Sequence, residues 1–454
     1  MPFTSINPAT EEIVVEYLTH APAEVDHALK VSSGAFQEWK SMSFADRAEV
    51  MTRAGELLES EVPVVAQLMT TEMGKTFSAA KGEAMKCAAT MRYYAEHTES
   101  MLVEQSLSTN GRRSGVRFEP VGPIFAVMPW NFPLWQVVRM AVPTIMAGNV
   151  VVFKHAPNVP GCAKYIEDLF LRAGFPEGVL TTLFVEIDQI PVIIADPRIV
   201  GVTLTGSDRA GRSIAELAGK NLKKCVLELG GSDPFVVAAS ADMERTVSMA
   251  VTARVQNNGQ ACIAAKRFIV VKERYDEFVE QFVEAMSKVP MGDPMDPATI
   301  LGPLVSKTQR DLLAAQVASS IEAGAVALTG GVAPEGVGYY YPATVLVNVP
   351  ADSRAGCEEL FGPVAVVYQA HDLADAIRIA NNTPWGLGGS IWAQDEDEIE
   401  QGIAGLVVGT VFANAMVASM NELPFGGTKS SGFGRELSAL GVREFTNAKS
   451  FFVA

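Results

Sequence analysis

The sequence is poor in the residues that build disulfide frameworks and metal sites. Its 454 residues include five cysteines and five histidines, with no Cys-x-x-Cys pair and no histidine cluster at ligand spacing. An odd and sparse set of cysteines makes a disulfide framework implausible and fits a reducing compartment. We therefore expect no structural or catalytic metal ion.

Positive charge and long apolar runs are also lacking. The formal net charge is −16, which argues against nucleic acid and anionic membrane as partners. No apolar run reaches the ~20 residues that span a bilayer. The N-terminus has neither a basic segment followed by an apolar one nor an Arg-rich amphipathic stretch. We expect a soluble, cytoplasmic protein whose partner is a small molecule.

The chain is long enough to divide into two or three domains. Residues 21–106 carry apolar residues at the three- and four-residue spacing that predicts amphipathic helices. Short β-branched runs then alternate with helical segments, both before and after the pair Gly230–Gly231. This alternation predicts an α/β fold with doubly wound parallel sheets, divided at the glycine pair. The tail, residues 441–454, ends in an apolar strand expected to pair with another subunit.

Cys262 is the candidate nucleophile. It lies at the end of a polar, amide-rich run and before an apolar run, Arg267–Val271, that predicts a strand. A polar loop before a buried strand presents a side chain from a rigid scaffold, although a free cysteine is more often inert packing. The remaining cysteines are interpreted as small core residues: Cys87, Cys162, Cys225 and Cys357.

Two other residues have the chemistry that a nucleophilic cysteine needs. Asn131, within Pro-Trp-Asn-Phe-Pro, offers an amide donor in apolar surroundings, as an oxyanion hole requires. A structural turn is the alternative interpretation. Glu228 lies in an apolar run, where burial would raise its pKa towards that of a useful base. A paired structural acid is the alternative there.

Two stretches predict a dinucleotide site. Gly201–Gly211 predicts a strand, a glycine-spaced turn and a helix, whose small residues let a pyrophosphate approach the helix N-terminus. Glu359 and Phe361 place a carboxylate beside an aromatic ring. The carboxylate can bind the two hydroxyls of a ribose, and the ring can flank a planar heterocycle.

Five motifs occur together across nearly the whole chain, in the order PWNFP, LELGGSDP, NNGQACIAAKRF, EELFGPV and PFGGTKSSGFGRE. In this the chain resembles the aldehyde dehydrogenase superfamily, and it is most similar to the bacterial succinate-semialdehyde dehydrogenase branch. The resemblance implies two doubly wound parallel-sheet domains plus a small β oligomerisation extension. The cofactor-binding domain would be 1–107 and 127–229, the catalytic domain 230–423, and the oligomerisation segment 108–126 and 434–454.

The resemblance also implies a reaction, the oxidation of an aldehyde to a carboxylic acid. Cys262 would attack the aldehyde carbon, and the Asn131 amide and the Cys262 N–H would hold the oxyanion. After hydride transfer, Glu228 would activate the water that hydrolyses the thioester. Splitting oxidation from hydrolysis in this way gives two easier steps.

For the cofactor, the resemblance assigns Lys154 to the adenosine ribose, Trp130 and Ser207 to the pyrophosphate, and Glu359 and Phe361 to the nicotinamide ribose. NADP-preferring relatives often carry a serine where this chain has Pro157, so we expect NAD as the preferred cofactor, with NADP possible. The other residues expected at the cofactor are Met128, Pro129, Ala156, Gly206, Gly211, Leu229 and Gly230.

For the substrate, Arg139 matches an arginine that relatives use to bind a distal carboxylate, which a guanidinium does well. The alternative for Arg139 is a structural ion pair. Trp135 and Ser419 would belong to the same pocket. Gln256 stands where several succinate-semialdehyde enzymes carry a second arginine, and Ala264 where some carry a second cysteine.

Succinate semialdehyde is the expected substrate, with glutarate semialdehyde or another small aldehyde as alternatives. A CoA-acylating enzyme, in which a thiol replaces water, is a further alternative that Glu228 disfavours. A non-catalytic protein on the same fold is a third, which the presence of Cys262, Glu228 and Asn131 disfavours. We expect a homodimer or homotetramer.

Overall fold

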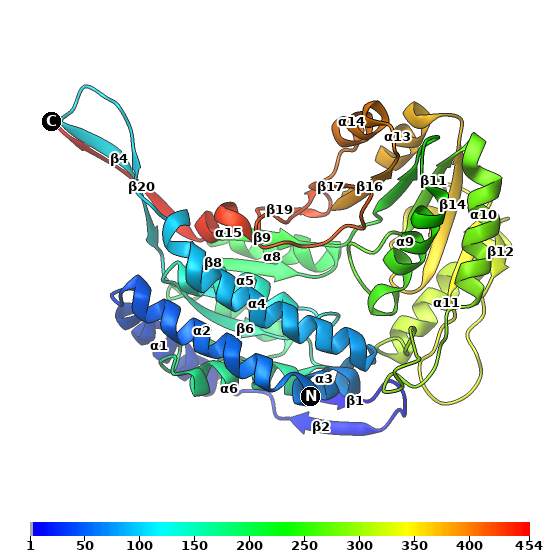
Figure 1. Ribbon diagram of the computed structural model, residues 1–454. Helices are drawn as coiled ribbons and strands as arrows, with labels where there is room; N and C mark the ends of the chain where they lie inside the picture. Colours follow the sequence, from blue (N-terminus) through cyan, green and yellow to red (C-terminus); the bar gives the residue numbers. More distant parts are fainter. Residues whose placement is uncertain (1–2) are drawn as a thin grey trace.

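The computed structural model describes residues 3–454, and two parallel sheets organise them (Figure 1). The six-stranded sheet has the order β19-β9-β8-β5-β6-β7, with β19 antiparallel to β9 and the others parallel. Its strands are β5 (Pro123–Val127), β6 (Val150–Lys154), β7 (Leu180–Thr182), β8 (Gly201–Thr205), β9 (Lys224–Glu228) and β19 (Gly432–Phe433).

Helices cover both faces of this sheet. Side chains alternate along β5, so that Ile124 and Ala126 join one apolar cluster and Phe125 joins another. Burial on both faces is why such strands are continuously apolar. The helices are α1 (Pro22–Trp39), α2 (Phe44–Ser60), α3 (Val62–Met73), α4 (Phe77–Met101), α5 (Trp135–Met146), α6 (Pro160–Ala173), α7 (Ile190–Ala195), α8 (Asp208–Lys220), α15 (Ser438–Glu444) and the 3₁₀ turn η1 (Ile187–Gln189).

The seven-stranded sheet has the order β12-β13-β14-β11-β10-β16-β17. Only β12 runs antiparallel to its neighbour. The strands are β10 (Pro234–Val237), β11 (Arg267–Val271), β12 (Val326–Thr329), β13 (Thr344–Val347), β14 (Val364–Ala370), β16 (Gly388–Trp392) and β17 (Thr410–Ala413).

This second sheet is also covered on both faces. Phe235 and Val237 of β10 pack with residues of α9 and α10, whereas Val236 packs with residues of α13 and α14. The expected α/β fold with two doubly wound parallel sheets is thereby confirmed. The helices are α9 (Met243–Val255), α10 (Lys272–Ser287), α11 (Lys307–Glu322), α12 (Arg354–Cys357), α13 (Leu373–Asn381), α14 (Glu396–Gly405) and the 3₁₀ turn η2 (Gln256–Gly259).

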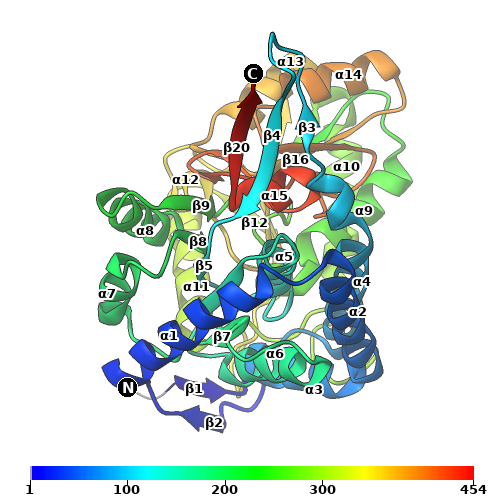
Figure 2. The same ribbon diagram turned by 90° about the vertical axis from the view of Figure 1, so that its left-hand side faces the viewer.

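A long arm, built on a three-stranded sheet, projects from the body (Figures 1 and 2). In it β20 (Thr446–Val453) runs antiparallel to β4 (Arg113–Pro120), and the short β3 (Gln105–Ser106) pairs with the other edge of β4. The tail therefore pairs within its own chain. Two small sheets complete the fold, β1 (Phe3–Ile6) with β2 (Ile13–Tyr17) and β15 (Trp385–Gly386) with β18 (Thr428–Lys429).

Local sequence explains several element ends. Thr76 caps α4 by accepting a hydrogen bond from the Ala79 N–H, and Ser207 caps α8 in the same way. Gly174 ends α6 in the left-handed conformation that glycine adopts without cost. Among residues 3–454, no helix combines the length and apolar character needed to cross a bilayer.

Candidate active site

The candidate site lies where the strand order of the first sheet reverses. β5 has β6 on one side and β8 on the other, and the carboxyl ends of β5 and β8 lead into Pro129–Asn131 and Gly206–Ser207. Ligands of open α/β sheets bind at such a switch point. A cavity of about 280 Å³ opens here. Residues from distant segments line it, including Trp130, Asn131, Ser207, Glu228, Cys262 and Glu359.

The turn before Cys262 has an unusual backbone. Asn257, Asn258 and Gly259 have φ values of 52°, 58° and 73°, a left-handed conformation that costs energy for residues other than glycine. Tertiary hydrogen bonds hold it: Asn258 Nδ2 donates to the Gly74 and Pro303 carbonyls, each at 2.9 Å. This turn sets the direction of the chain, so that Cys262 lies at the cavity.

A buried lysine holds the other side of the Cys262 loop. Lys266 Nζ donates to the carbonyls of Ala261, Cys262 and Ala264 at 3.1, 2.7 and 3.2 Å. It also lies 3.3 Å from Glu359 Oε1, which accepts the Gly231 N–H. Lys266 therefore connects the loop that carries the thiol to the Glu359 carboxylate, which also lines the cavity.

The Cys262 side chain is partly exposed to the cavity. Burial raises the pKa of this thiol to about 12, although Arg139 and Lys266 each act to lower it. A thiolate is the nucleophilic form, so a base must take the proton for the sulfur to attack.

Asn131 lies beside Cys262 at the wall of the cavity. Its Nδ2 donates to the Gln260 carbonyl at 3.0 Å, and its own carbonyl accepts from Asn257 Nδ2 at 2.8 Å. An amide group has two N–H donors, so one remains for a ligand. The asparagine is thus tied to the turn that positions the thiol.

Glu228 ends β9 and is buried against the same cavity. Neither carboxylate oxygen has a hydrogen-bond partner among residues 3–454. Burial, and then the nearby Glu436 carboxylate, raise the pKa of Glu228 well above its usual value. An unpaired carboxyl group of raised pKa has the properties of a general base rather than of a structural ion pair.

Most residues expected at the cofactor line this cavity. Its wall contains Pro129, Trp130, Gly206, Ser207, Leu229, Gly230, Glu359 and Phe361. The Trp130 and Phe361 rings meet edge to face, with centroids 5.6 Å apart. A Cβ at position 230 would lie 2.4 Å from Glu359 Oε2. Glycine at this position therefore leaves that part of the wall open. The size and composition of the wall fit the nicotinamide end of a dinucleotide.

The remaining cofactor candidates lie further along the first sheet. Lys154 and Pro157 line a separate hollow of about 530 Å³. Burial lowers the pKa of Lys154 to about 8, and its Nζ donates to the His155 carbonyl. Met128 and Ala156 are buried beside these loops, and Gly211 packs where a Cβ would meet the Leu229 side chain.

Arg139, the residue expected to bind the substrate carboxylate, already contacts a carboxylate of the protein. It lies on α5, is fully buried, and forms an ion pair with Glu436. The Arg139 Nη2 also lies 3.4 Å from Thr205 Oγ1. The ion pair agrees with the alternative interpretation, a structural role, but it uses only Nε of the guanidinium, so binding of the substrate carboxylate by Arg139 stays a prediction.

Lys86, which the sequence did not single out, contacts both Trp135 and Ser419. The Lys86 ammonium lies 4.0 Å from the centroid of the Trp135 ring. It also donates to both the carbonyl and the Oγ of Ser419, each at 2.8 Å. The sequence signal for Lys86 was weak: a lysine next to buried positions on a long helix.

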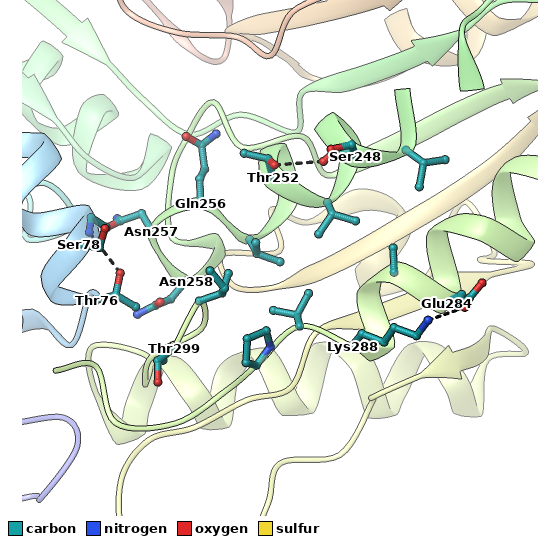
Figure 3. A pocket seen from close by; sticks show the side chains of 18 of the residues that line it. Thr76, Ser78, Ser248, Thr252, Gln256, Asn257, Asn258, Glu284, Lys288 and Thr299 are labelled. Carbon is teal, nitrogen blue, oxygen red and sulfur yellow. Dashed lines mark hydrogen bonds and ion pairs between the residues drawn. The ribbon is translucent and has the colours of Figure 1, made fainter. Parts of the chain in front are cut away.

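Gln256 lies at a different and larger cavity, of about 940 Å³, between the start of α4 and helices α9 and α10 (Figure 3). Its Nε2 is buried without a hydrogen-bond partner among the described residues. Asn257 lines this cavity and donates to Asn131, which lines the smaller one. The Asn257–Asn131 hydrogen bond thus lies between the two cavities.

The other cysteines differ in how far they are buried. Cys87 and Cys162 are buried, as expected, and Cys225 is half-buried. Cys357 is exposed at the end of α12, so its interpretation as a core residue was wrong. Within the described part of the chain, no group of three or more His, Cys, Asp and Glu side chains is placed to hold a metal ion.

Comparison with known proteins identifies this architecture. The family model "Aldehyde dehydrogenase family" matches residues 1–451. The chain is 48% identical to succinate-semialdehyde dehydrogenase [NADP(+)] 1 of Mycobacterium tuberculosis, over 100% of both chains. It is 49% identical to succinate-semialdehyde dehydrogenase [NADP(+)] of Mycobacterium avium, over 100% of this chain and 97% of the relative.

A solved structure agrees. The succinic semialdehyde dehydrogenase of Streptococcus pyogenes, in complex with NADP+, superposes with a TM-score of 0.97 at 36% identity, over 99% of each chain. The chain belongs to the aldehyde dehydrogenase family and is an oxidoreductase that uses a nicotinamide cofactor. The expected preference for NAD finds no support here, since these relatives are named for NADP+.

The left-handed turn yields a prediction. In Gly259→Ala, the new Cβ would lie 2.3 Å from the Gly362 carbonyl carbon at a φ of 73°. Strain of this kind costs about 1–3 kcal/mol, and relief requires the Cys262 loop to move. We expect a lower Tm together with a fall of at least about tenfold in kcat, since small misplacements of reacting groups are costly.

Gly219→Ala is the matched control. Gly219 lies inside α8, and a Cβ added there would have no other atom within 4 Å. This alanine should be neutral or stabilise by about 0.5–1 kcal/mol. Full activity in Gly259→Ala would show that the turn does not position the thiol.

Proposed function

We propose that this enzyme oxidises succinate semialdehyde to succinate. The observation that carries the proposal is the convergence of Cys262, Asn131, Glu228 and Glu359 on one cavity of about 280 Å³. The names of the relatives at 48% and 49% identity support the choice of aldehyde. In this proposal residues 1–107 and 127–229 bind the cofactor, and residues 230–423 carry the nucleophile.

The chain supplies a nucleophile, an oxyanion donor and a base. The Cys262 thiol passes its proton to solvent, and the sulfur forms a bond to the aldehyde carbon. The Asn131 Nδ2 and the Cys262 N–H donate to the resulting oxyanion. A bound oxidised nicotinamide would supply the acceptor for the hydride of that carbon. Glu228 then takes a proton from water, whose oxygen bonds to the thioester carbon as the carbon–sulfur bond breaks.

Water is favoured over coenzyme A as the acceptor because Glu228 keeps both carboxylate oxygens free of protein partners among residues 3–454. Water depends on such a base more than an external thiol does, because the pKa of water lies far above that of a thiol. Glutarate semialdehyde, one methylene longer, is the second candidate, and a hydrophobic pocket discriminates one methylene by only about 10–200-fold.

Substitutions of the two polar residues test the proposed roles. In Glu228→Gln, acylation can proceed while thioester hydrolysis slows, so mixing with substrate should give a burst of about one reduced nicotinamide per site before a slow steady state. Asn131→Ala should lower kcat by about 10²–10³ with no burst. Stopped-flow absorbance of the reduced nicotinamide distinguishes them, and an unchanged steady state in Glu228→Gln would refute the base.

We infer that NADP+ is the cofactor, in place of the NAD expected from Pro157. The relatives named for NADP+ support this, as does the Lys154 ammonium in a hollow that also contains Asn158. Among residues 3–454, the Lys154 Nζ donates to a single carbonyl, that of His155. Donors therefore remain for a 2′-phosphate.

The ratio of kcat/KM for the two cofactors tests this inference. NADP+ should give the higher value, and Lys154→Met should reduce it by at least about tenfold, since a charge-assisted hydrogen bond is lost. The NAD+ value should change less. Lys220→Met, an exposed lysine of α8, is the control. Equal losses with both cofactors would contradict a role at the 2′-phosphate.

We also propose that the arm formed by β4 and β20 joins subunits into a dimer or tetramer. Within residues 3–454 no strand pairs with the outer edge of β20, and Phe452 on it is 56% exposed. A long edge strand without a partner favours pairing with another chain.

Deletion of residues 446–454 should convert the oligomer to a monomer, measured by light scattering after size exclusion. Phe452→Lys places a charge on the same strand and should weaken the assembly without shortening the chain. A monomeric parent protein, or a truncated protein of unchanged mass, would refute the role of the arm.

A further inference from the structure

Helix α5 is buried along its whole length, yet it carries a glutamine beside the candidate oxyanion donor. All 12 residues of α5 are buried, and three of them have polar or charged side chains: Gln136, Arg139 and Thr144. Arg139 forms an ion pair, and Thr144 donates within its own helix. Of the three, only Gln136 lines the cavity that contains Cys262.

The Gln136 amide donates to the side chain of Asn131. Its Nε2 lies 3.4 Å from Asn131 Oδ1 and is the only donor to that oxygen among residues 3–454. This distance is long for a hydrogen bond, as contacts between catalytic groups often are before a ligand binds. At the other end of the amide, Asn131 Nδ2 donates to the Gln260 carbonyl. The two contacts together define which end of the amide faces the Cys262 loop.

The orientation of this amide decides whether Asn131 can serve as an oxyanion donor. If the group were turned over, its oxygen would face both the Gln260 carbonyl and the developing negative charge, and an amide oxygen only accepts hydrogen bonds. A donor on Oδ1 holds the working orientation. It also polarises the amide, which strengthens donation by the Nδ2 hydrogens. Gln136 can therefore affect the rate without contact with the aldehyde.

The rest of the Gln136 side chain gains little from its position. It is 1% exposed, and its Oε1 has no hydrogen-bond partner among the described residues. A buried acceptor without a partner destabilises the folded state. Methionine is also unbranched, is similar in length and has no such group to bury. The glutamine is thus better explained by its contact with Asn131 than by packing.

The start of α5 is held firmly, which fixes Gln136 relative to Asn131. The Gln136 N–H donates to the Phe132 carbonyl at 3.0 Å. Glu83 of α4 accepts the N–H groups of the two preceding residues, each at 2.9 Å. Rigid support of this kind is what a positioning contact requires.

We propose that Gln136 is a positioning residue of the oxyanion hole, which orients and polarises the Asn131 amide for the steps in which negative charge develops. The proposal rests on the proposed function, in which Asn131 is the oxyanion donor. Because Gln136 acts through Asn131, its effect disappears when the Asn131 side chain is absent.

Single-turnover formation of the reduced nicotinamide tests this, with enzyme in excess over succinate semialdehyde and saturating NADP+. Gln136→Met should slow this step about 3–10-fold, as expected when one neutral hydrogen bond is lost. Asn131→Ala should slow it about 10²–10³-fold. The double variant Asn131→Ala/Gln136→Met should be as slow as Asn131→Ala alone, within about twofold. The Tm of Gln136→Met should equal or exceed that of the parent, because an unpaired buried acceptor is removed.

Gln37→Met is the matched control, since Gln37 is an exposed glutamine on α1, and it should leave both the rate and the Tm unchanged. A further 3–10-fold loss in the double variant would overturn the proposal, because Gln136 would then act independently of Asn131. An unchanged rate in Gln136→Met, or a variant that does not fold, would assign the glutamine to the structure alone and overturn it as well. Full activity in Asn131→Ala would instead overturn the oxyanion role in the proposed function.

Discussion

The position of the candidate nucleophile depends on a short piece of strained backbone. Asn257, Asn258 and Gly259 turn the chain left-handed between α9 and the Cys262 loop. Such a turn persists only when surrounding structure determines it. Here Asn258 is bound to carbonyls from the α3–α4 connection and from the loop after Gly302, while Asn257 is bound to Asn131. Parts of both sheet units therefore fix the geometry of one thiol.

The sheet topology supplies the other side of the site. Because β5 and β8 are neighbours but are followed by chain that departs in opposite directions, their carboxyl ends leave a gap. Trp130 and Ser207 border it, and Glu228 enters from the end of β9. The carboxylate of Glu359 belongs to the second unit, where it contacts Gly231 and Lys266, and it lines the same cavity. The site exists because two sheets place their loops against each other.

Much of this was predictable from sequence, for identifiable reasons. The alternation of β-branched runs and helices gave the fold class, and local motifs singled out Cys262, Asn131 and Glu228, which the structure brings to one cavity. What sequence could not give was the partner of a charged side chain. Arg139 meets Glu436 across 297 positions, and Lys86 meets Ser419 across 333. The exposure of Cys357 was hidden for the same reason, since burial depends on neighbours distant in the chain.

The last residues of the chain complete structures that begin near its start. β19 adds an edge to the first sheet beside β9, α15 packs on α4 and α5, and β20 pairs along the whole of β4. Contacts so distant in sequence close late and slow the search for the native state. During synthesis the first unit would thus stay incomplete, with one sheet edge and one arm unpaired, until residues 432–453 have left the ribosome. Completion of the first sheet is in this sense the final event of folding rather than the first.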